Sequence, residues 1–194
     1  QLTNFWRCPV VSILFCGSRS FSSLPVVQGP VSRWLSSGGG IVCGSSAGAD
    51  SLVVSAAVNA GGASRLQVLA AFSVTGAGAG SCSSVQSARF ASASGASVVW
   101  LAGGPLSVPF RARLAARSAS AASQAAGGVV FSVGGALGPG SSLAVSCLVS
   151  RGCPVWLFSP SPGAVRGLSG SWVPSVFCGF SCFRFVPAQL SFGF

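Results

Sequence analysis

Three Gly- and Ser-rich turns, each following a short apolar run, constrain the fold of this chain more than any other feature. The apolar runs 10–16, 41–43 and 129–133 lead into turns at 17–19, 44–50 and 138–142. Short β-favouring runs that end in turn residues, with helical patterns behind them, indicate buried parallel strands. We therefore predict an α/β fold, a Rossmann-like three-layer sandwich with a mostly parallel sheet of about six strands.

The three turns also predict a binding site. The carboxyl ends of parallel strands meet at one edge of a sheet, and the backbone N–H groups of such turns and of the helices behind them bind phosphate. Arg19 directly follows the first strand, where its guanidinium suits a phosphate contact, although a solvated position is the alternative. The candidate ligand-binding residues of the turns are Gly17, Ser18, Arg19, Gly44, Ser45, Gly48, Asp50, Gly138, Gly140 and Ser141.

The stretch 110–125 is the clearest helical pattern, and it carries Arg111, Arg113 and Arg117 in its first half. Cations near a helix N-terminus oppose the helix dipole unless an anion lies nearby. This placement favours a ligand contact, and we add Arg111 and Arg113 to the candidate ligand-binding residues.

Asp50 is the only acidic residue in the chain. One interpretation is structural: its carboxylate accepts backbone N–H groups and braces the turn 44–48. The other is functional: the carboxylate binds a ribose hydroxyl or a base. Both roles can hold at once.

The net charge of +10 is carried by Arg alone. A strongly basic chain usually binds a polyanion. Here, however, most residues are of types that can be encoded without adenine, and Lys and Glu are absent. We infer a coding bias against adenine, which by itself makes a protein basic. The charge alone therefore leaves the choice of partner open.

The chain has eight Cys and no His. Without His no Cys/His metal site can form, and we predict neither a metal nor a cofactor. Cys16, Cys43 and Cys147 lie in apolar patterns typical of buried, reduced thiols, and we expect a cytoplasmic protein. No stretch supplies the roughly 20 predominantly large apolar residues that a membrane span requires, so no membrane partner is expected.

The composition changes after residue 158 to Pro, Ser, Gly and Phe, with Cys178 and Cys182 inside this segment. We predict a domain over residues 1–158 and a tail over 159–194. A poorly ordered or loosely packed tail is the preferred interpretation, and a defined appendage the alternative. Two Cys without a second pair are weak evidence for metal, and a disulfide remains open.

Several motifs in the predicted order resemble the SLOG superfamily of Rossmann-like proteins, which includes the DNA-processing protein A and lonely-guy groups. The turn 17–19 matches a Gly-Ser-Arg motif, the turn 44–50 is similar to Gly-x-Ala-x-Gly-x-Asp, and residues 138–141 resemble the final Gly-Ser turn. Residues 110–113 are similar to the Arg-Asn-Arg segment of the DNA-processing branch, with Ala112 in place of Asn. The catalytic Glu of the lonely-guy pattern has no counterpart after Ser141.

Together, the residues and the resemblance favour a non-catalytic module that recognises the phosphate of a nucleotide or nucleotide-derived ligand. The alternative is binding of single-stranded DNA in the manner of the DNA-processing proteins, through Arg19, Arg111, Arg113 and Arg117. A phosphoribohydrolase is the third possibility. General acid/base catalysis would have only Asp50 and the thiols to draw on, so we assign no catalytic residue. Whether the chain forms a homo-oligomer is left open.

Overall fold

The computed structural model describes residues 10–71, 82–105 and 107–188. Within these residues the sheet has eight strands in the order β4-β3-β2-β1-β5-β6-β8-β7. Strands β1 to β6 run parallel to one another. β8 pairs antiparallel with β6, and β7 pairs antiparallel with β8. Their bounds are β1 (Ser12–Gly17), β2 (Gly40–Gly44), β3 (Leu66–Ala71), β4 (Ser97–Leu101), β5 (Gly128–Phe131), β6 (Val155–Phe158), β7 (Gly170–Phe177) and β8 (Phe180–Pro187). The predicted fold class is confirmed, with two strands more than expected.

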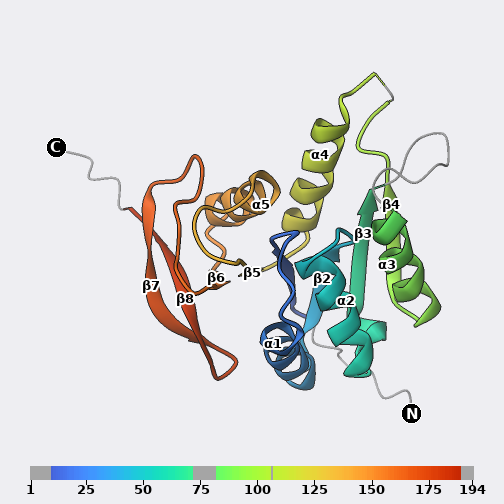
Figure 1. Ribbon diagram of the computed structural model, residues 1–194, viewed down its shortest axis with the longest axis horizontal. Coiled ribbons are helices and arrows are strands. Elements are labelled where there is room, and N and C mark those ends of the chain that lie inside the picture. Colours follow the sequence, from blue (N-terminus) through green and yellow to red (C-terminus); the bar gives the residue numbers. More distant parts are fainter. Residues whose placement is uncertain (1–9, 72–81, 106, 189–194) are drawn as a thin grey trace, which may run out of the picture.

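Helices cover both faces of the sheet, which makes three layers (Figure 1). One face is covered by α1 (Leu24–Ser36), α2 (Ala49–Asn59) and α3 (Cys82–Ala93). The other is covered by α4 (Phe110–Ser123) and α5 (Pro139–Ser150), which pack against each other. A short 3-10 helix, Ala63–Arg65, precedes β3. None of the helices in the described ranges is long and apolar enough to cross a membrane.

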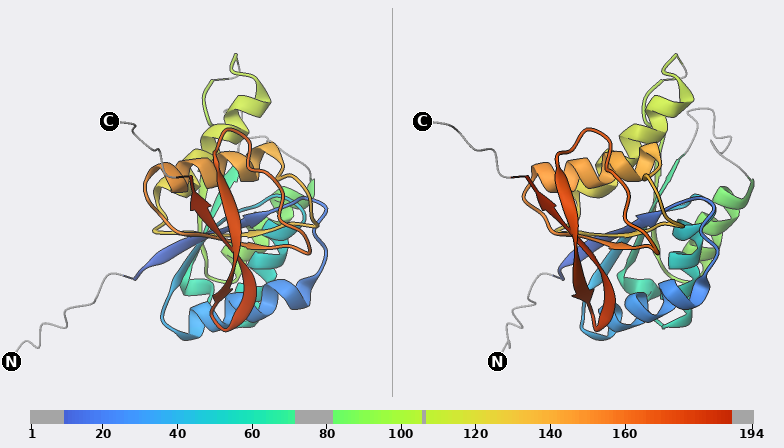
Figure 2. Two further views of the ribbon diagram at one scale, coloured as in Figure 1. Left: turned by 90° about the vertical axis from the view of Figure 1, so that its left-hand side faces the viewer. Right: turned by 60° about the vertical axis from the view of Figure 1, so that its left-hand side comes forward.

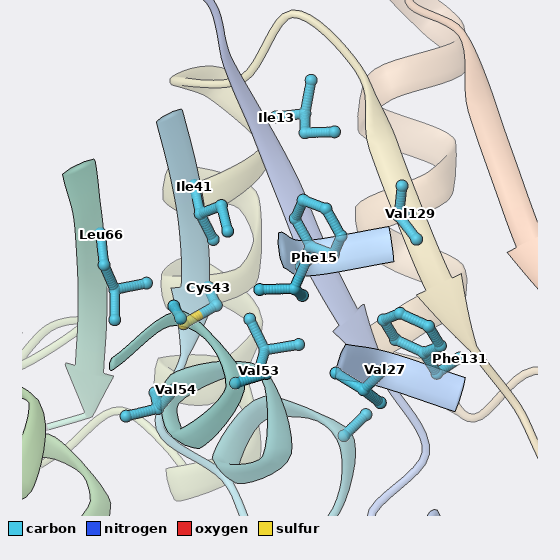
Figure 3. Packing of buried hydrophobic residues seen from close by; sticks show 14 of the residues in the cluster. Ile13, Phe15, Val27, Ile41, Cys43, Val53, Val54, Leu66, Val129 and Phe131 are labelled. Carbon is cyan, nitrogen blue, oxygen red and sulfur yellow. The ribbon is translucent and has the colours of Figure 1, made fainter. Parts of the chain in front are cut away.

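Successive side chains of β1 point to opposite faces of the sheet, so apolar side chains must be buried on both faces. Ile13 and Phe15 pack with α1 and α2 in one apolar cluster, whereas Leu14 packs with α4 and α5 in the other. Figure 3 shows the first cluster, to which Phe15 contributes from β1, Val27 from α1 and Val53 from α2. Each strand of the sheet centre therefore places side chains in two cores, as expected for a doubly wound sheet.

The expectation of a poorly ordered tail is wrong for the hairpin formed by β7 and β8 (Figure 2). β8 pairs with β6, so the hairpin extends the sheet. A two-residue turn of Cys178 and Gly179 joins the strands, both with positive φ (52° and 89°), as a tight hairpin requires. Cys178 and Cys182 are free thiols. The domain boundary after residue 158 stays a prediction.

The hairpin also packs against α1. α1 continues through Gly29 and Pro30, although both residue types are unfavourable inside a helix. A Cβ at Gly29 would lie 2.6 Å from Cζ of Phe180, so the missing side chain makes room for the hairpin turn.

Candidate functional site

The topology predicts where a ligand binds. From β1 the chain builds the sheet outward through β2, β3 and β4, and then returns to place β5 on the other side of β1. In open α/β sheets the crevice beyond the carboxyl ends of the strands at such a reversal is the usual ligand site. A pocket of about 850 Å³ lies there, lined by the turns after β1 and β2, the first residues of α5, and one side of α4.

The first turn is held close to β5 and α2. Gly17 ends β1, and a Cβ there would overlap the carbonyl oxygen of Phe131, so only glycine fits. The N–H of Ser18 donates to that same oxygen over 2.8 Å, and the carbonyl of Ser18 accepts the N–H of Ala49 over 3.0 Å. The turn is therefore rigid where it meets the pocket, while the exposed side chain of Arg19 lies on the pocket wall.

The second turn is organised by Asp50, which is only 6% exposed. Its Oδ2 accepts the backbone N–H of Ser46 over 3.2 Å, which is the bracing contact expected from the sequence. A Cβ at Gly44 would overlap Oδ2, which explains the glycine. The Nη2 of Arg117, from α4, donates to Oγ of Ser46 over 3.2 Å and brings a buried cation to the same place.

Burial raises the pKa of Asp50 above its ordinary value, because the charged form loses its hydration. The Arg117 guanidinium, the Ser46 N–H and Arg19 act in the opposite direction and lower this pKa. Burial likewise raises the pKa of Cys16, with a smaller contribution from Asp50. The Cys16 thiol, which also lines the pocket, is therefore protonated at neutral pH.

The third turn places a helix N-terminus on the pocket. Gly138 is the N-cap of α5, and no side chain caps the helix. Pro139 has no N–H, and the first helical bond runs from the N–H of Ser142 to the carbonyl of Gly138, over 2.8 Å. The N–H groups of Gly140 and Ser141 therefore have no acceptor within the helix, and both residues line the pocket. Such N–H groups, with the helix dipole behind them, bind anions.

Four arginine side chains from three separate segments line the pocket. Arg19 follows β1, Arg111 and Arg117 lie on α4, and Arg166 lies in the segment between β6 and β7. Asp50 is the one carboxylate among the lining residues. An excess of positive charge in a concave site raises the local concentration of anions.

The structure places the predicted site residues in two groups. Those that line the pocket are Gly17, Ser18, Arg19, Gly44, Asp50, Arg111, Gly138, Gly140 and Ser141. Ser45, Gly48 and Arg113 do not line it. Ser45 is buried, and its Oγ shares a 2.9 Å hydrogen bond with Oγ of Ser84. Gly48 is the N-cap of α2, with φ of 82°, and packs on the backbone of Ser18 and Arg19.

Sequence reasoning missed Arg166, Ser46 and Phe110 as lining residues, and named Arg117 only for the DNA alternative. Arg166 reaches the pocket because its segment packs beside the loop after β5: Pro162 forms a bridge with Gly135, and a Cβ at Gly163 would overlap the carbonyl of Gly135. No local pattern signals this long-range packing. Arg117 lies four residues after Arg113 on α4, and Ser46 directly follows Ser45, so proximity to the motifs could have indicated both.

Comparison with known proteins supports the fold. The sequence matches no protein-family model and no curated protein. The structure is similar to the crystal structure of DNA processing protein A (DprA) from Streptococcus pneumoniae, with a TM-score of 0.55 and 20% sequence identity. The similarity covers 81% of this chain and 52% of that protein, so the chain spans about half its length. The protein thus has a Rossmann-type fold like that of DprA.

Proposed function

We propose that the protein binds the phosphate of a nucleotide or nucleotide-derived ligand in the pocket between β1, β2 and α5, and does not transform it. The observation that carries this proposal is the convergence of the free N–H groups of Gly140 and Ser141 with the side chains of Arg19, Arg117 and Arg166 on one pocket. The pocket volume of about 850 Å³ is in the range of small-molecule and cofactor sites.

The chemistry of the lining supports binding without turnover. General acid/base catalysis needs a titratable group that can reach the substrate. Asp50 is buried and already accepts the Ser46 N–H, and the Cys16 thiol is kept protonated by burial. Other lining residues offer hydroxyls, guanidinium groups and apolar surface, which recognise a ligand. On this proposal the chain is a binding member of the SLOG superfamily.

A second candidate is binding of single-stranded DNA. The solved neighbour is a DNA processing protein, and Arg19 and Arg111 are exposed on the pocket wall, where a strand backbone could pass. Phosphate contacts along a strand release counterions, so the affinity would fall with salt by about 0.7 logarithmic units per contact for each tenfold rise.

Isothermal titration calorimetry tests the proposal. The four ribonucleoside 5′-monophosphates, ribose 5-phosphate and a single-stranded oligonucleotide are titrated into the protein at two salt concentrations. Arg19→Ala should weaken binding of the phosphate ligands by about 1.5–3 kcal/mol, the range for hydrogen bonds to charged groups. Arg33→Ala on α1, which does not line the pocket, is the matched control.

The outcomes separate the candidates. Binding of a monophosphate with weak salt dependence supports the small-ligand site. Binding of the oligonucleotide alone, with a steep salt dependence, supports the second candidate instead. Equal effects of Arg19→Ala and Arg33→Ala on monophosphate affinity would contradict the assignment of the pocket.

A further inference from the structure

An aromatic ring is part of the pocket wall. Phe110 is the first residue of α4, lines the pocket and keeps 41% of its surface exposed. The apolar neighbours Leu114 and Ala115 continue this side of the pocket along α4, and Leu143 and Ala144 line it from α5. The pocket therefore has a polar floor at the strand ends and an apolar wall between the two helices.

The guanidinium of Arg113 lies over this ring. Its Cζ lies 5.7 Å from the centroid of the Phe110 ring, within the range of a cation–π contact. Its Nε and Nη1 are buried and have no hydrogen-bond partner among the residues that the structure describes. Burying N–H donors without acceptors is unfavourable, and the ring quadrupole offsets part of this cost.

The backbone fixes Arg113 in this position. Gly103, with φ of 71°, lies against Arg113, where a Cβ would be 2.5 Å from the Arg113 carbonyl oxygen. This contact holds the first turn of α4 against the loop that follows β4. One face of the Phe110 ring is thus backed by the guanidinium, and the ring still presents exposed surface to the pocket.

We propose that Phe110 is the platform on which the nucleobase of the ligand stacks, with Arg113 as its positioning residue. This inference rests on the proposed function, which places the phosphate at the start of α5. A planar base suits an exposed ring that is held in place, because stacking uses the π-face that every base has. Arg113 then acts through Phe110 and makes no contact with phosphate.

The test compares a ligand that has a base with one that lacks it. Calorimetry measures the affinity of ribose 5-phosphate and of the ribonucleoside 5′-monophosphate that binds tightest. Phe110→Ala should lower the affinity for the monophosphate by about 5- to 150-fold, as for loss of a stacked base, and leave that for ribose 5-phosphate within twofold. Phe110→Trp should retain the monophosphate affinity. Phe90→Ala, a similarly exposed ring on α3 outside the pocket lining, should change neither.

A double-mutant cycle tests the positioning role. Arg113→Ala should lower the affinity for the monophosphate only, and should have no further effect in the Phe110→Ala background. A loss of ribose 5-phosphate affinity in Arg113→Ala would show a phosphate contact and overturn this role. Equal losses for both ligands in Phe110→Ala, or no loss, would overturn the stacking platform alone. A wild-type protein that binds neither ligand would overturn the proposed function itself, and this inference with it.

Discussion

Phe177, near the tip of the β7–β8 hairpin, should be one of the most sensitive core positions of the protein. It is 5% exposed, and its ring lies 4.9 Å from Trp156, 5.9 Å from Trp34, 6.2 Å from Phe15 and 6.4 Å from Phe158, measured between centroids. Phe177→Ala removes these contacts and leaves a cavity, which typically costs about 3–5 kcal/mol. Native domains are stable by only about 5–15 kcal/mol, so this loss is large.

Urea unfolding, followed by tryptophan fluorescence, measures the change in the free energy of unfolding. Val176→Ala is the matched control, because Val176 is adjacent on β7 and 61% exposed, and should cost less than about 1 kcal/mol. Phe177→Leu keeps much of the volume and should lose clearly less than Phe177→Ala. A loss below about 1 kcal/mol in Phe177→Ala, or a truncated variant 1–158 that melts cooperatively at the wild-type temperature, would refute the assignment of the hairpin to the core.

Two further predictions concern Asp50. Asp50→Ala leaves the Ser46 N–H without its acceptor and should be less stable than Asp50→Asn by about 0.5–2 kcal/mol in urea unfolding, whereas equal stabilities would contradict the bracing role. Because burial raises the folded-state pKa of Asp50 above 3.8, the folded state binds the proton more tightly than the unfolded chain, so stability should rise as the pH falls from neutral through that pKa toward 3.8. Asp50→Asn should lack this rise. If the stability of the wild type fell with pH in parallel with that of Asp50→Asn, the predicted direction of the pKa shift would be contradicted.

The parts of the site that depend on local sequence could be predicted. Gly17 ends β1 and Gly138 is the N-cap of α5, and the pattern of apolar run, turn and helix places both at the same edge of the sheet. The bracing of the turn by Asp50 could likewise be predicted, because Asp50 and Ser46 are only four residues apart in the sequence.

The remaining parts depend on long-range packing and helix phase. The positions of Arg166 and the hairpin depend on pairing with β6 and on contacts beside β5, which no local pattern records. β7 contains Pro174, which the strand tolerates because β7 lies at the edge of the sheet. Arg111 and Arg113 are two residues apart, so they lie about 200° apart around α4 and cannot both face the pocket directly.

We propose that a ligand phosphate lies where the strand order reverses, against the start of α5. A ¹H–¹⁵N NMR titration of the labelled protein with a ribonucleoside 5′-monophosphate tests it directly, because each backbone amide reports its own surroundings. We expect the largest shifts on the amides of Ser18, Gly140 and Ser141. The amides of Gly61 and Gly152, which follow the C-terminal ends of α2 and α5, should stay unchanged. Shifts concentrated at Gly61 and Gly152, with Gly140 and Ser141 unaffected at saturation, would contradict it.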